Sequence, residues 1–511
     1  MGVYGRLDVP LPTASQAAAA DRSAREEHGI PDRVLMESAG RAAALVLSRL
    51  HPRGRITGVA GSGHNGGDLL VMMRTLRSWG RDVRIIAGGS NPPDLSLMHG
   101  ADLDIIAADQ AGAALSHADV IVDGMLGTGA KGAPRSGIAD WVRRINDTPA
   151  PVLALDVPSG VDATTGAAAD PAVHATATVT FGWPKLGLLL HPARAHCGRL
   201  IAVEIGFPPD CVHADAHLIT SAWVRTHLRQ RGASAHKGTA GRLLVLAGHE
   251  GMAGAGAISA CAALRAGVGL IRIASDDANR IILQTLVPEA TFLDRQRIEA
   301  ADVEPMHALL AGPGMGTDDA ARASLMNMLD LMPGKPALLD ADALNILASD
   351  SDGLRAAAEA RPLVITPHAR ELSRLTGSSL ADILTDMPAA ARAAAHEFSC
   401  VVLLKGQPSL IAAPSGELWV NSVGSSDVAA AGMGDQLAGT IGALLAGGEE
   451  PLRAAALGLF LSGRAADLAG LGRSLSPADV SAQLARAIAD PGPTASMLDL
   501  PFITLDQPAR H

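Results

Sequence analysis

Aromatic residues are scarce in this sequence, whose 511 residues include 5 tryptophans, 1 tyrosine and 6 phenylalanines, so few rings are available to stack on a base. Cysteine is also rare, and the four residues Cys197, Cys211, Cys261 and Cys400 form no Cys-x-x-Cys pair and no metal-ligand spacing with the histidines. This pattern argues against a disulfide framework. It favours a reducing compartment, and we expect a cytoplasmic protein.

Clustered positive charge and long apolar segments are missing as well. Lys and Arg number 42 against 52 Asp and Glu, a net charge of −10 with no basic cluster, which gives a nucleic-acid-binding surface little support. The first residues carry Asp8 and prolines instead of a basic stretch before an apolar run, and no charge-free apolar segment reaches membrane length. We therefore expect neither a nucleic acid nor a membrane as partner.

Length and composition predict two α/β domains. A single hydrophobic core seldom serves more than roughly 250 to 300 residues, and this chain is longer. Apolar residues make up 48% of it and charged residues 18%, and glycine (55 residues) and alanine are abundant. That balance suits buried parallel strands flanked by Ala-rich helices.

Short apolar runs alternate with helical stretches in two series. Strands are predicted at residues 55–60, 83–87, 120–122, 152–155, 178–181 and 200–205, and then at 243–247, 270–274, 309–311, 337–339, 363–365, 401–404 and 409–413. Two helices are predicted within residues 12–50, with Thr13 and Ser15 as N-cap candidates and Pro31 at the start of the second. The polar stretch 208–238 separates the two series, which predicts domains at 1–215 and 222–495 and a tail at 496–511.

Three loops after predicted strands of the first half, at residues 61–68, 122–129 and 155–162, could form a ligand site. Residues 61–68 read Gly-Ser-Gly-His-Asn-Gly-Gly-Asp and precede an apolar helix, so their amides can converge on an anion. Loops of this kind meet at the carboxyl edge of an open α/β sheet. Oxygens from Asn65, Asp123 and Ser159 would suit a hard monovalent or divalent cation. A tight strand-to-helix connection, with each Asp capping a helix, is the structural alternative.

The sharpest motif is Ala-Ala-Gly-Met-Gly-Asp at residues 430–435, which an uncharged helical run follows. Successive glycine amides at a helix start form an anion hole, and Asp435 could exchange a proton there. The motif therefore predicts phosphoryl chemistry, with a small-residue turn ahead of a buried helix as the alternative.

Other loops of the second half belong to the same predicted site, at residues 312–316, 340–345, 366–368 and 404–406. Lys405 would neutralise a phosphate or remain a solvated charge, and His368 is more typical of a structural residue. Asp340, Asp342 and Asn345 would position a ligand or magnesium, or else cap a helix.

Both halves resemble known enzyme domains. The first half resembles the NAD(P)H-hydrate epimerase domain through residues 11–21, 35–40, 64–68, 123–129, 156–162, 181–187 and 205–206. The second half, over roughly residues 225–490, is similar to the ADP-dependent NAD(P)H-hydrate dehydratase domain through the loops above and residues 236–238, 251–255 and 263–267. This resemblance implies an α/β fold class throughout, with a Rossmann-like three-layer N-terminal domain and a ribokinase-like α/β C-terminal domain.

The resemblance also implies site residues. In the first half, potassium is assigned to Asn65, Asp123 and Ser159, with Asp123 as candidate general acid/base, and substrate to His64, Asn65, Gly66, Gly67, Asp68, Gly127, Thr128, Gly129, Ala130, Lys131, Gly132, Ala133 and Asp156. In the second half, the hydrated nucleotide is assigned to Ala255, Gly316, His368 and Asp435, and ADP to Lys405, Gly406, Gln407, Pro408, Ser409 and Gly434.

The implied function is repair of hydrated NADH and NADPH. The first half would interconvert the R and S hydrates. The second half would phosphorylate the hydroxyl of the S hydrate, with ADP as donor and magnesium present, and then eliminate phosphate, leaving AMP. Phosphate departs far more readily than hydroxide near neutral pH, and Asp435 would deprotonate the attacking hydroxyl. The resemblance further implies a homo-oligomer.

Two other functions remain open from the sequence. A small-molecule kinase acting on a vitamin precursor or a sugar alcohol would use the same Gly-x-Gly-Asp turn. A non-catalytic nucleotide-binding protein would explain departures from the family pattern at His64, Leu69, 131–132, 369–370 and 425–428. Leu69 would either narrow the pocket of the first half or face its core.

Overall fold

The computed structural model describes residues 9–88, 93–98, 103–107, 109–229, 231–233, 236–421, 423–492 and 503–504. The chain divides into two compact units, the first formed by residues 1–217 with 494–511 and the second by residues 218–493. Within the described ranges, no helix combines the length and the apolar character needed to cross a membrane.

The first unit is built on a mostly parallel sheet with the strand order β19-β8-β7-β6-β5-β2-β3-β4. Its strands are β2 (Ile56–Ala60), β3 (Val83–Ala87), β4 (Asp104–Ile106), β5 (Val120–Gly124), β6 (Val152–Leu155), β7 (Ala177–Phe181), β8 (Arg199–Val203) and β19 (Ile503–Thr504). The short strand β1 (Val9–Pro10) comes first in the chain and is not part of this sheet. Only β19 among these sheet strands runs antiparallel to its neighbour, β8. The strand β19 therefore places part of the predicted tail in this sheet.

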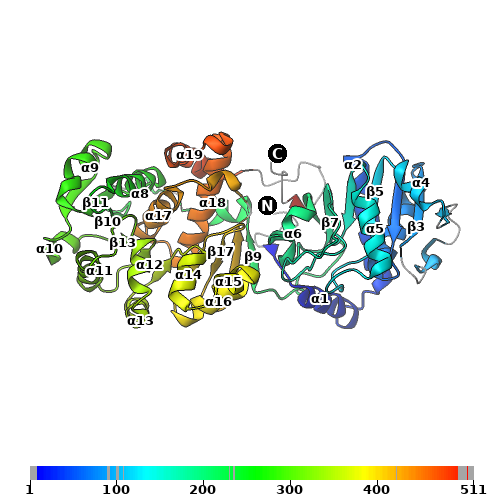
Figure 1. Ribbon diagram of the computed structural model, residues 1–511, viewed down its shortest axis with the longest axis horizontal. Coiled ribbons are helices and arrows are strands. Elements are labelled where there is room, and N and C mark those ends of the chain that lie inside the picture. Colours follow the sequence, from blue (N-terminus) through cyan, green and yellow to red (C-terminus); the bar gives the residue numbers. More distant parts are fainter. Residues whose placement is uncertain are drawn as a thin grey trace. The chain divides into compact units, whose positions relative to one another are not determined.

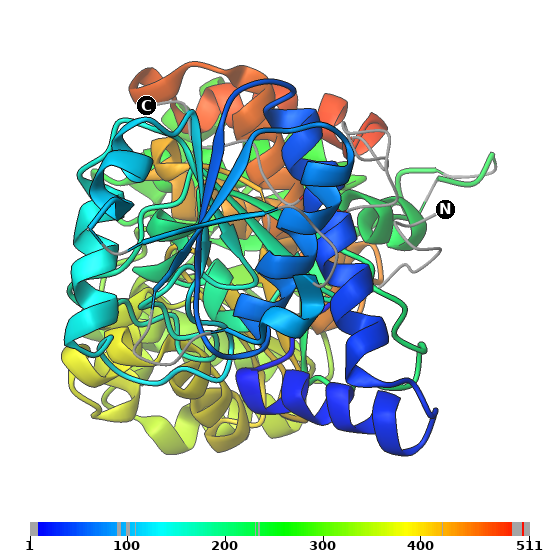
Figure 2. The ribbon, with the colours of Figure 1, turned by 90° about the vertical axis from the view of Figure 1, so that its right-hand side faces the viewer.

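Helices cover both faces of this sheet, as the blue and cyan helices of Figure 2 show. They are α1 (Ala14–Glu26), α2 (Asp32–Leu50), α3 (His64–Ser78), α4 (Ala111–Ser116), α5 (Ser136–Asn146) and α6 (Ala193–Cys197). Two separate apolar cores result, one between the sheet and α2 and α3, the other between the sheet and α4 and α5. The three-layer Rossmann-like prediction is confirmed.

The second unit has a larger sheet, in which the strands run β9-β18-β17-β16-β15-β14-β13-β10-β11-β12. Their bounds are β9 (Ala216–Ile219), β10 (Arg242–Leu246), β11 (Leu270–Ser275), β12 (Thr291–Asp294), β13 (Ala308–Ala311), β14 (Ala337–Leu339), β15 (Leu363–Ile365), β16 (Val401–Leu404), β17 (Leu410–Ala412) and β18 (Leu418–Asn421). The strands from β12 to β16 are parallel, whereas β16, β17 and β18 form an antiparallel meander.

Helices lie on both faces of this sheet too, with α8, α17, α18 and α19 on one side and α11 to α16 on the other (Figure 1). The helices of the unit are α7 (Ser221–His227), α8 (Ala253–Ala266), α9 (Arg280–Leu286), α10 (Ala300–Val303), α11 (Asp319–Leu331), α12 (Asp342–Leu347), α13 (Ser351–Ala360), α14 (Ala369–Thr376), α15 (Leu380–Thr385), α16 (Met387–Glu397), α17 (Met433–Ala446), α18 (Pro451–Ala469) and α19 (Pro477–Ala489). This sandwich is the ribokinase-like arrangement that was predicted.

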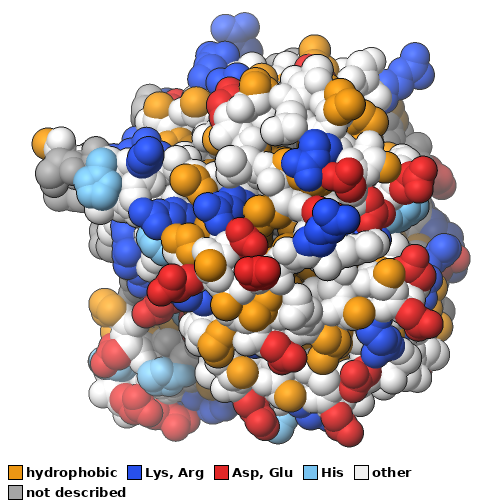
Figure 3. All heavy atoms as spheres, turned by 90° about the vertical axis from the view of Figure 1, so that its left-hand side faces the viewer, with side chains coloured by type: hydrophobic (Ala, Val, Ile, Leu, Met, Phe, Trp, Pro, Cys, Tyr) orange, Lys and Arg blue, Asp and Glu red, His pale blue; other side chains and the backbone are white. Residues whose placement is uncertain are grey.

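The surface of this unit carries no dominant charge on the face drawn in Figure 3, where basic, acidic and hydrophobic side chains of the described residues are interspersed. That mixture agrees with the modest net charge of −10.

The predicted elements correspond closely to the observed ones, with a few instructive differences. Thr13 caps α1 in a reciprocal capping box with Gln16, whereas Ser15 lies inside the helix. The polar stretch 208–238, in which no element was predicted, contains β9 and the short helix α7, which is capped by Thr220. The strands β4, β12 and β18 were not predicted, and β12 is only partly buried at the sheet edge.

Helices α8 and α17 approach so closely that a glycine is needed between them. A Cβ atom at Gly439 would lie 2.1 Å from the carbonyl oxygen of Ser259, which the backbone cannot accommodate without moving. We expect Gly439→Ala to destabilise the second unit by about 1–3 kcal/mol, the range typical of overpacking. Scanning calorimetry of the full chain would measure it. The matched control is Gly256→Ala in α8, where the new Cβ would meet Leu283 at an ordinary 3.5 Å; equal losses from both variants would contradict this packing argument.

Candidate active sites

The loops predicted to form the first site follow three neighbouring strands. Strand β2 pairs with β5, and β5 pairs with β6, all parallel. Their carboxyl ends therefore lie side by side at one edge of the sheet, and residues 61–68, 123–129 and 156–162 follow them. The turn before α3 is compact, because a Cβ at Gly66 would lie 1.9 Å from the carbonyl oxygen of Gly61.

Asp123 and Ser159 are joined inside this edge. Both residues are fully buried. The Ser159 hydroxyl donates to Asp123 Oδ1 at 2.7 Å, the Ser159 amide donates to Asp123 Oδ2 at 2.8 Å, and the Met125 amide donates to Oδ1 at 3.2 Å. Burial raises the pKa of Asp123 to about 6, even though these hydrogen bonds favour its charged form.

Asn65 completes this group and leaves one oxygen available. Its Nδ2 donates to the carbonyl oxygens of Leu126 at 2.7 Å and Leu155 at 3.0 Å, which fixes the side chain between two loops. Its Oδ1 is buried and accepts no hydrogen bond from the residues that the structure describes. A buried acceptor without a donor is unfavourable unless a ligand satisfies it. This donor set therefore fits a cation such as potassium.

Asp156 forms a second charged centre, paired with Lys185. The Lys185 ammonium donates to Asp156 Oδ1 at 2.6 Å, to Thr180 Oγ1 at 3.0 Å and to the Phe181 carbonyl at 2.8 Å, and it is 4% exposed. Asp156 has a φ of 59°, a strained value for a residue other than glycine, and such strain is concentrated at functional sites.

Two further carboxyl groups lie within electrostatic reach of this pair. Burial, then Asp156 and Asp21, raise the pKa of Asp68 well above its ordinary value. Desolvation also raises the pKa of Asp21. Lys185 and His64 lower that pKa, whereas Asp156 raises it further. The first unit thus holds several carboxyl groups close to one buried ammonium.

The remaining predicted residues of the first unit divide into two sets. Gly127 lies beside the group, since a Cβ there would be 3.3 Å from Asn65 and 3.6 Å from Asp156. The predicted residues that follow Gly127 are partly or fully exposed, and the structure does not bring them into this hydrogen-bonded group. They are Thr128, Gly129, Ala130, Lys131, Gly132 and Ala133. Leu69 faces the core, where it is fully buried against Gly58 and Gly124, so it does not narrow a pocket.

Lys405 is the centre of the predicted site in the second unit. Its ammonium lies 2.7 Å from Asp340 Oδ1 and 3.8 Å from Glu371 Oε2, and both carboxylates are almost completely buried. Burial lowers the pKa of Lys405, but the two carboxylates outweigh it and raise that pKa overall. The residue is a partly buried lysine paired with two carboxylates rather than the solvated one considered from the sequence.

Asp435 lies in the first turn of α17, where the glycines predict an anion hole. Gly432, at a φ of 81°, caps the helix, and a Cβ at Gly434 would lie 3.6 Å from Lys405 Nζ and 3.7 Å from Asp340. Burial and the charges of Asp340 and Asp342 raise the pKa of Asp435 to about 7, although Lys405 lowers it. A carboxyl group with that pKa can exchange protons near neutrality.

The other predicted residues of this unit take structural positions around the same centre. The Nδ1 atom of His368 accepts hydrogen bonds from the amides of Arg370 and Glu371, both at 3.1 Å, so His368 caps α14. Asp342 Oδ2 accepts from the Gly316 amide at 3.0 Å and joins two strand-end loops.

Two more loops are closed by local contacts. A Cβ at Gly314 would lie 3.0 Å from Cβ of Ala255, so the start of α8 lies against the 312–316 loop. The Gly406 amide donates to Ser409 Oγ at 3.2 Å, which closes the turn that also contains Gln407 and Pro408.

Comparison with known proteins shows the family. A sequence model described as NAD(P)H-hydrate dehydratase matches residues 243–489, and one described as YjeF-related protein N-terminus matches residues 32–187. The bifunctional NAD(P)H-hydrate repair enzyme Nnr of Moorella thermoacetica is 36% identical over 491 residues, covering 89% of this chain and 92% of that protein. The chain belongs to the family of bifunctional NAD(P)H-hydrate repair enzymes.

Other members of this family match over similar lengths. The Escherichia coli K12 enzyme of the same name is 35% identical, covering 88% of this chain and 87% of the relative, and that of Mycobacterium leprae is 34% identical, covering 93% and 97%. A crystal structure of ADP/ATP-dependent NAD(P)H-hydrate dehydratase from Bacillus subtilis, co-crystallized with ATP/Mg2+, is 29% identical, with a TM-score of 0.47, and covers 53% of this chain and 96% of that one.

Three residues of these sites were not singled out from the sequence. Asp21 and Lys185 lie in segments that carry the family resemblance but were given no role there, and Glu371 lies outside the segments named for the second site. Lys185 follows β7, a fourth strand whose carboxyl end lies beside β6, and that position alone could have drawn attention to it.

Proposed function

We propose that the chain repairs hydrated NADH and NADPH, with its first unit interconverting the R and S hydrates and its second unit dehydrating the S hydrate. The observation that supports this best is Asp435, a carboxyl group with a pKa of about 7 at a glycine-rich helix start. A kinase or dehydratase of this fold requires such a base beside an anion hole.

The second unit would phosphorylate the hydroxyl group of the S hydrate. Asp435 would accept the hydroxyl proton, the oxygen would attack the β-phosphorus of ADP, and AMP would leave. The amides at the start of α17 and the ammonium of Lys405 would stabilise the charge on the transferring phosphoryl group. Loss of phosphate from its ring carbon, together with loss of a proton from the adjacent ring carbon, would then restore the dihydropyridine. Magnesium would be held mainly by the nucleotide phosphates.

The first unit would bind potassium through Asn65 Oδ1 together with Asp123 and Ser159. The cation would supply a fixed positive charge beside the substrate. The same proposal places substrate near Gly127, Asp156 and the 64–68 turn, with Asp123 as candidate acid/base. Assembly as a homo-oligomer and a cytoplasmic location remain predictions.

The proposal is tested by incubating the full-length protein with mixed R and S NADH hydrates, magnesium, potassium and either ADP or ATP. Return of the absorbance of reduced nicotinamide reports dehydration, and chromatographic separation of the two hydrates reports epimerisation. Full recovery of both hydrates is expected. Recovery of the S fraction alone would limit the function to dehydration, whereas a phosphorylated product that accumulates without elimination would support a small-molecule kinase instead.

A further inference from the structure

Three side chains with different metal-binding chemistry converge in the first unit. His28 follows α1, and Asp210 and Cys211 follow β8. One ligand atom from each lies within 4.8 Å of the other two, and His28 Nε2 is 3.5 Å from Asp210 Oδ1. None of the three belongs to the residues proposed for epimerisation or dehydration.

Their spacing fits a tetrahedral metal ion. Zinc binds imidazole nitrogen and carboxylate oxygen at about 2.0–2.2 Å and thiolate sulfur at about 2.3 Å, so two ligand atoms of one tetrahedral ion lie roughly 3.3–3.6 Å apart. The observed His28–Asp210 separation of 3.5 Å lies in that range. The Cys211 sulfur lies within 4.8 Å of both other ligand atoms, so a movement of about 1 Å brings it to that spacing.

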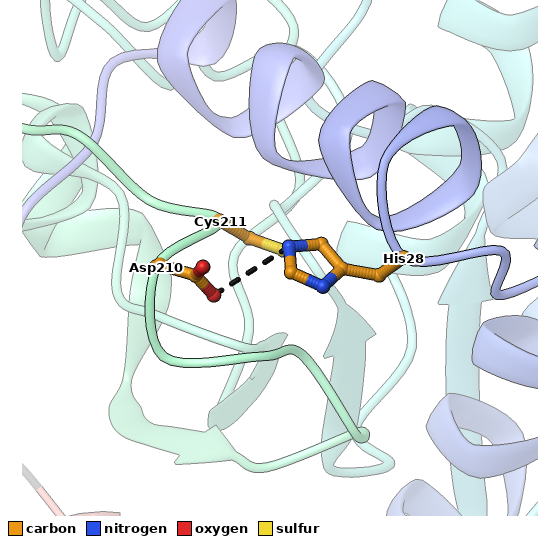
Figure 4. A group of neighbouring side chains, drawn as sticks. All are labelled: His28, Asp210 and Cys211. Atoms are coloured by element: carbon orange, nitrogen blue, oxygen red, sulfur yellow. Dashed lines mark ion pairs between the residues drawn. The ribbon is translucent and has the colours of Figure 1, made fainter.

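The orientation of the imidazole argues against the other chemistry that Cys, His and Asp can perform. In a nucleophilic relay, the cysteine contacts one ring nitrogen and the acid contacts the other. Figure 4 shows that the Cys211 sulfur and the Asp210 carboxylate both lie on the side of the same nitrogen of His28, while the second nitrogen points away. Convergence on one nitrogen is the arrangement of metal ligands.

The backbone positions two of the three ligands, Asp210 and Cys211, before any metal is bound. The Cys211 amide donates to the Pro208 carbonyl at 3.2 Å, which closes the turn carrying both Asp210 and Cys211. Cys211 is 3% exposed and packs in the apolar core of the unit, whereas the Asp210 side chain is 72% exposed. The apolar core therefore holds the Cys211 sulfur in place. On the exposed side, near Asp210, water can bind as a fourth ligand.

We propose that His28, Asp210 and Cys211 bind a thiophilic divalent cation, with zinc as the best match. On binding, the Cys211 thiol releases its proton to solvent, and the thiolate sulfur donates an electron pair to the metal. The ion would join the end of α1 to the segment after β8. That segment also stacks Phe207 on Trp183, with ring centroids 4.9 Å apart, and α1 carries Asp21. The metal thus stabilises the elements that support the epimerase site without taking part in its chemistry.

Cobalt(II) titration of the metal-free full-length protein tests the proposal, because cobalt replaces zinc and reports its ligands by absorption. We expect one equivalent to produce a sulfur-to-cobalt charge-transfer band in the near ultraviolet, with visible bands of tetrahedral intensity, and zinc to abolish them. The potassium and magnesium sites proposed above contain no sulfur, so they cannot produce this band.

Two single variants and one control make the result decisive. Cys211→Ser should remove the charge-transfer band, and His28→Gln, an exposed change that leaves the core intact, should weaken cobalt affinity by more than about tenfold. Cys261→Ser, a cysteine of the second unit, should leave the titration unchanged. Absence of the band in the parent protein, or an identical band in Cys211→Ser and His28→Gln, would overturn the proposal. Because this readout is independent of activity, it can fail while the repair function stands.

Discussion

Asp435→Asn is expected to lower the rate of ADP-dependent dehydration by about a thousandfold, within the 10²–10⁴ that general-base catalysis typically contributes. The substitution keeps the shape of the side chain but removes its ability to accept the hydroxyl proton. Epimerisation of R and S hydrates should continue at the parent rate, because the first unit has a separate fold and a separate residue set. Single-turnover formation of NADH from the S hydrate measures the loss.

The control for this variant is Asp319→Asn. Asp319 also lies in the first turn of a helix, α11, but it is exposed. The control should dehydrate the S hydrate normally. A dehydration rate for Asp435→Asn within threefold of the parent would exclude Asp435 as the base.

The pH dependence of dehydration should show the same base. Asp435 must be ionised to accept a proton, and its pKa is about 7, so kcat/KM should fall as pH decreases below that value. Lys405 lowers this pKa and Asp340 raises it. Lys405→Met should therefore move the acidic limb to higher pH, and Asp340→Asn should move it to lower pH, whatever their effects on the maximal rate. Shifts in the same direction would contradict the electrostatic assignment.

The sequence allowed the architecture to be predicted and candidate residues for both sites to be grouped, because both depend on local patterns. Apolar runs alternating with helical stretches indicate parallel strands, and in a parallel sheet the loops that follow adjacent strands meet at one edge. Asn65, Asp123 and Ser159 can be grouped in this way from the sequence alone. The hydrogen bonds that link Asp123 to Ser159 agree with that grouping.

Pairings across the sheet edge could not be predicted, since they depend on side-chain geometry between segments far apart in sequence. Lys405 is 65 residues from Asp340, and a lone strand-end lysine gives no sign of that partner. Leu69 is a case in which packing decided between two interpretations. From its position beside Asp68, the side chain could face either a pocket or the core, and its contacts with Gly58 and Gly124 show that it fills space in the core. Spacing identifies the candidates, and packing decides which of them interact.

Asp123→Asn should reduce epimerisation by at least about a hundredfold, in line with the loss of a buried carboxylate that either carries a proton or binds a cation. Dehydration of pure S hydrate by the same protein should be unchanged and provides an internal control. Because Asp123 accepts three hydrogen bonds, the calorimetric transition of the first unit must be compared with the parent. Asn65→Ala, which removes the unpartnered Oδ1 but no acceptor of these bonds, gives an independent second variant.

Potassium separates the two roles of Asp123. If Asp123 helps bind the cation, both variants should need more potassium, and high potassium should partly restore their rate. If Asp123 is a proton carrier that does not contact the cation, potassium should not restore the rate of Asp123→Asn.

The pH profile of epimerisation gives the same distinction. The pKa of Asp123 is about 6 without a cation, and a bound positive charge favours the carboxylate and lowers that value. The acidic limb of epimerisation should therefore lie at lower pH in potassium than in choline chloride. An identical limb in both salts would place the cation elsewhere and leave Asp123 as a proton carrier alone.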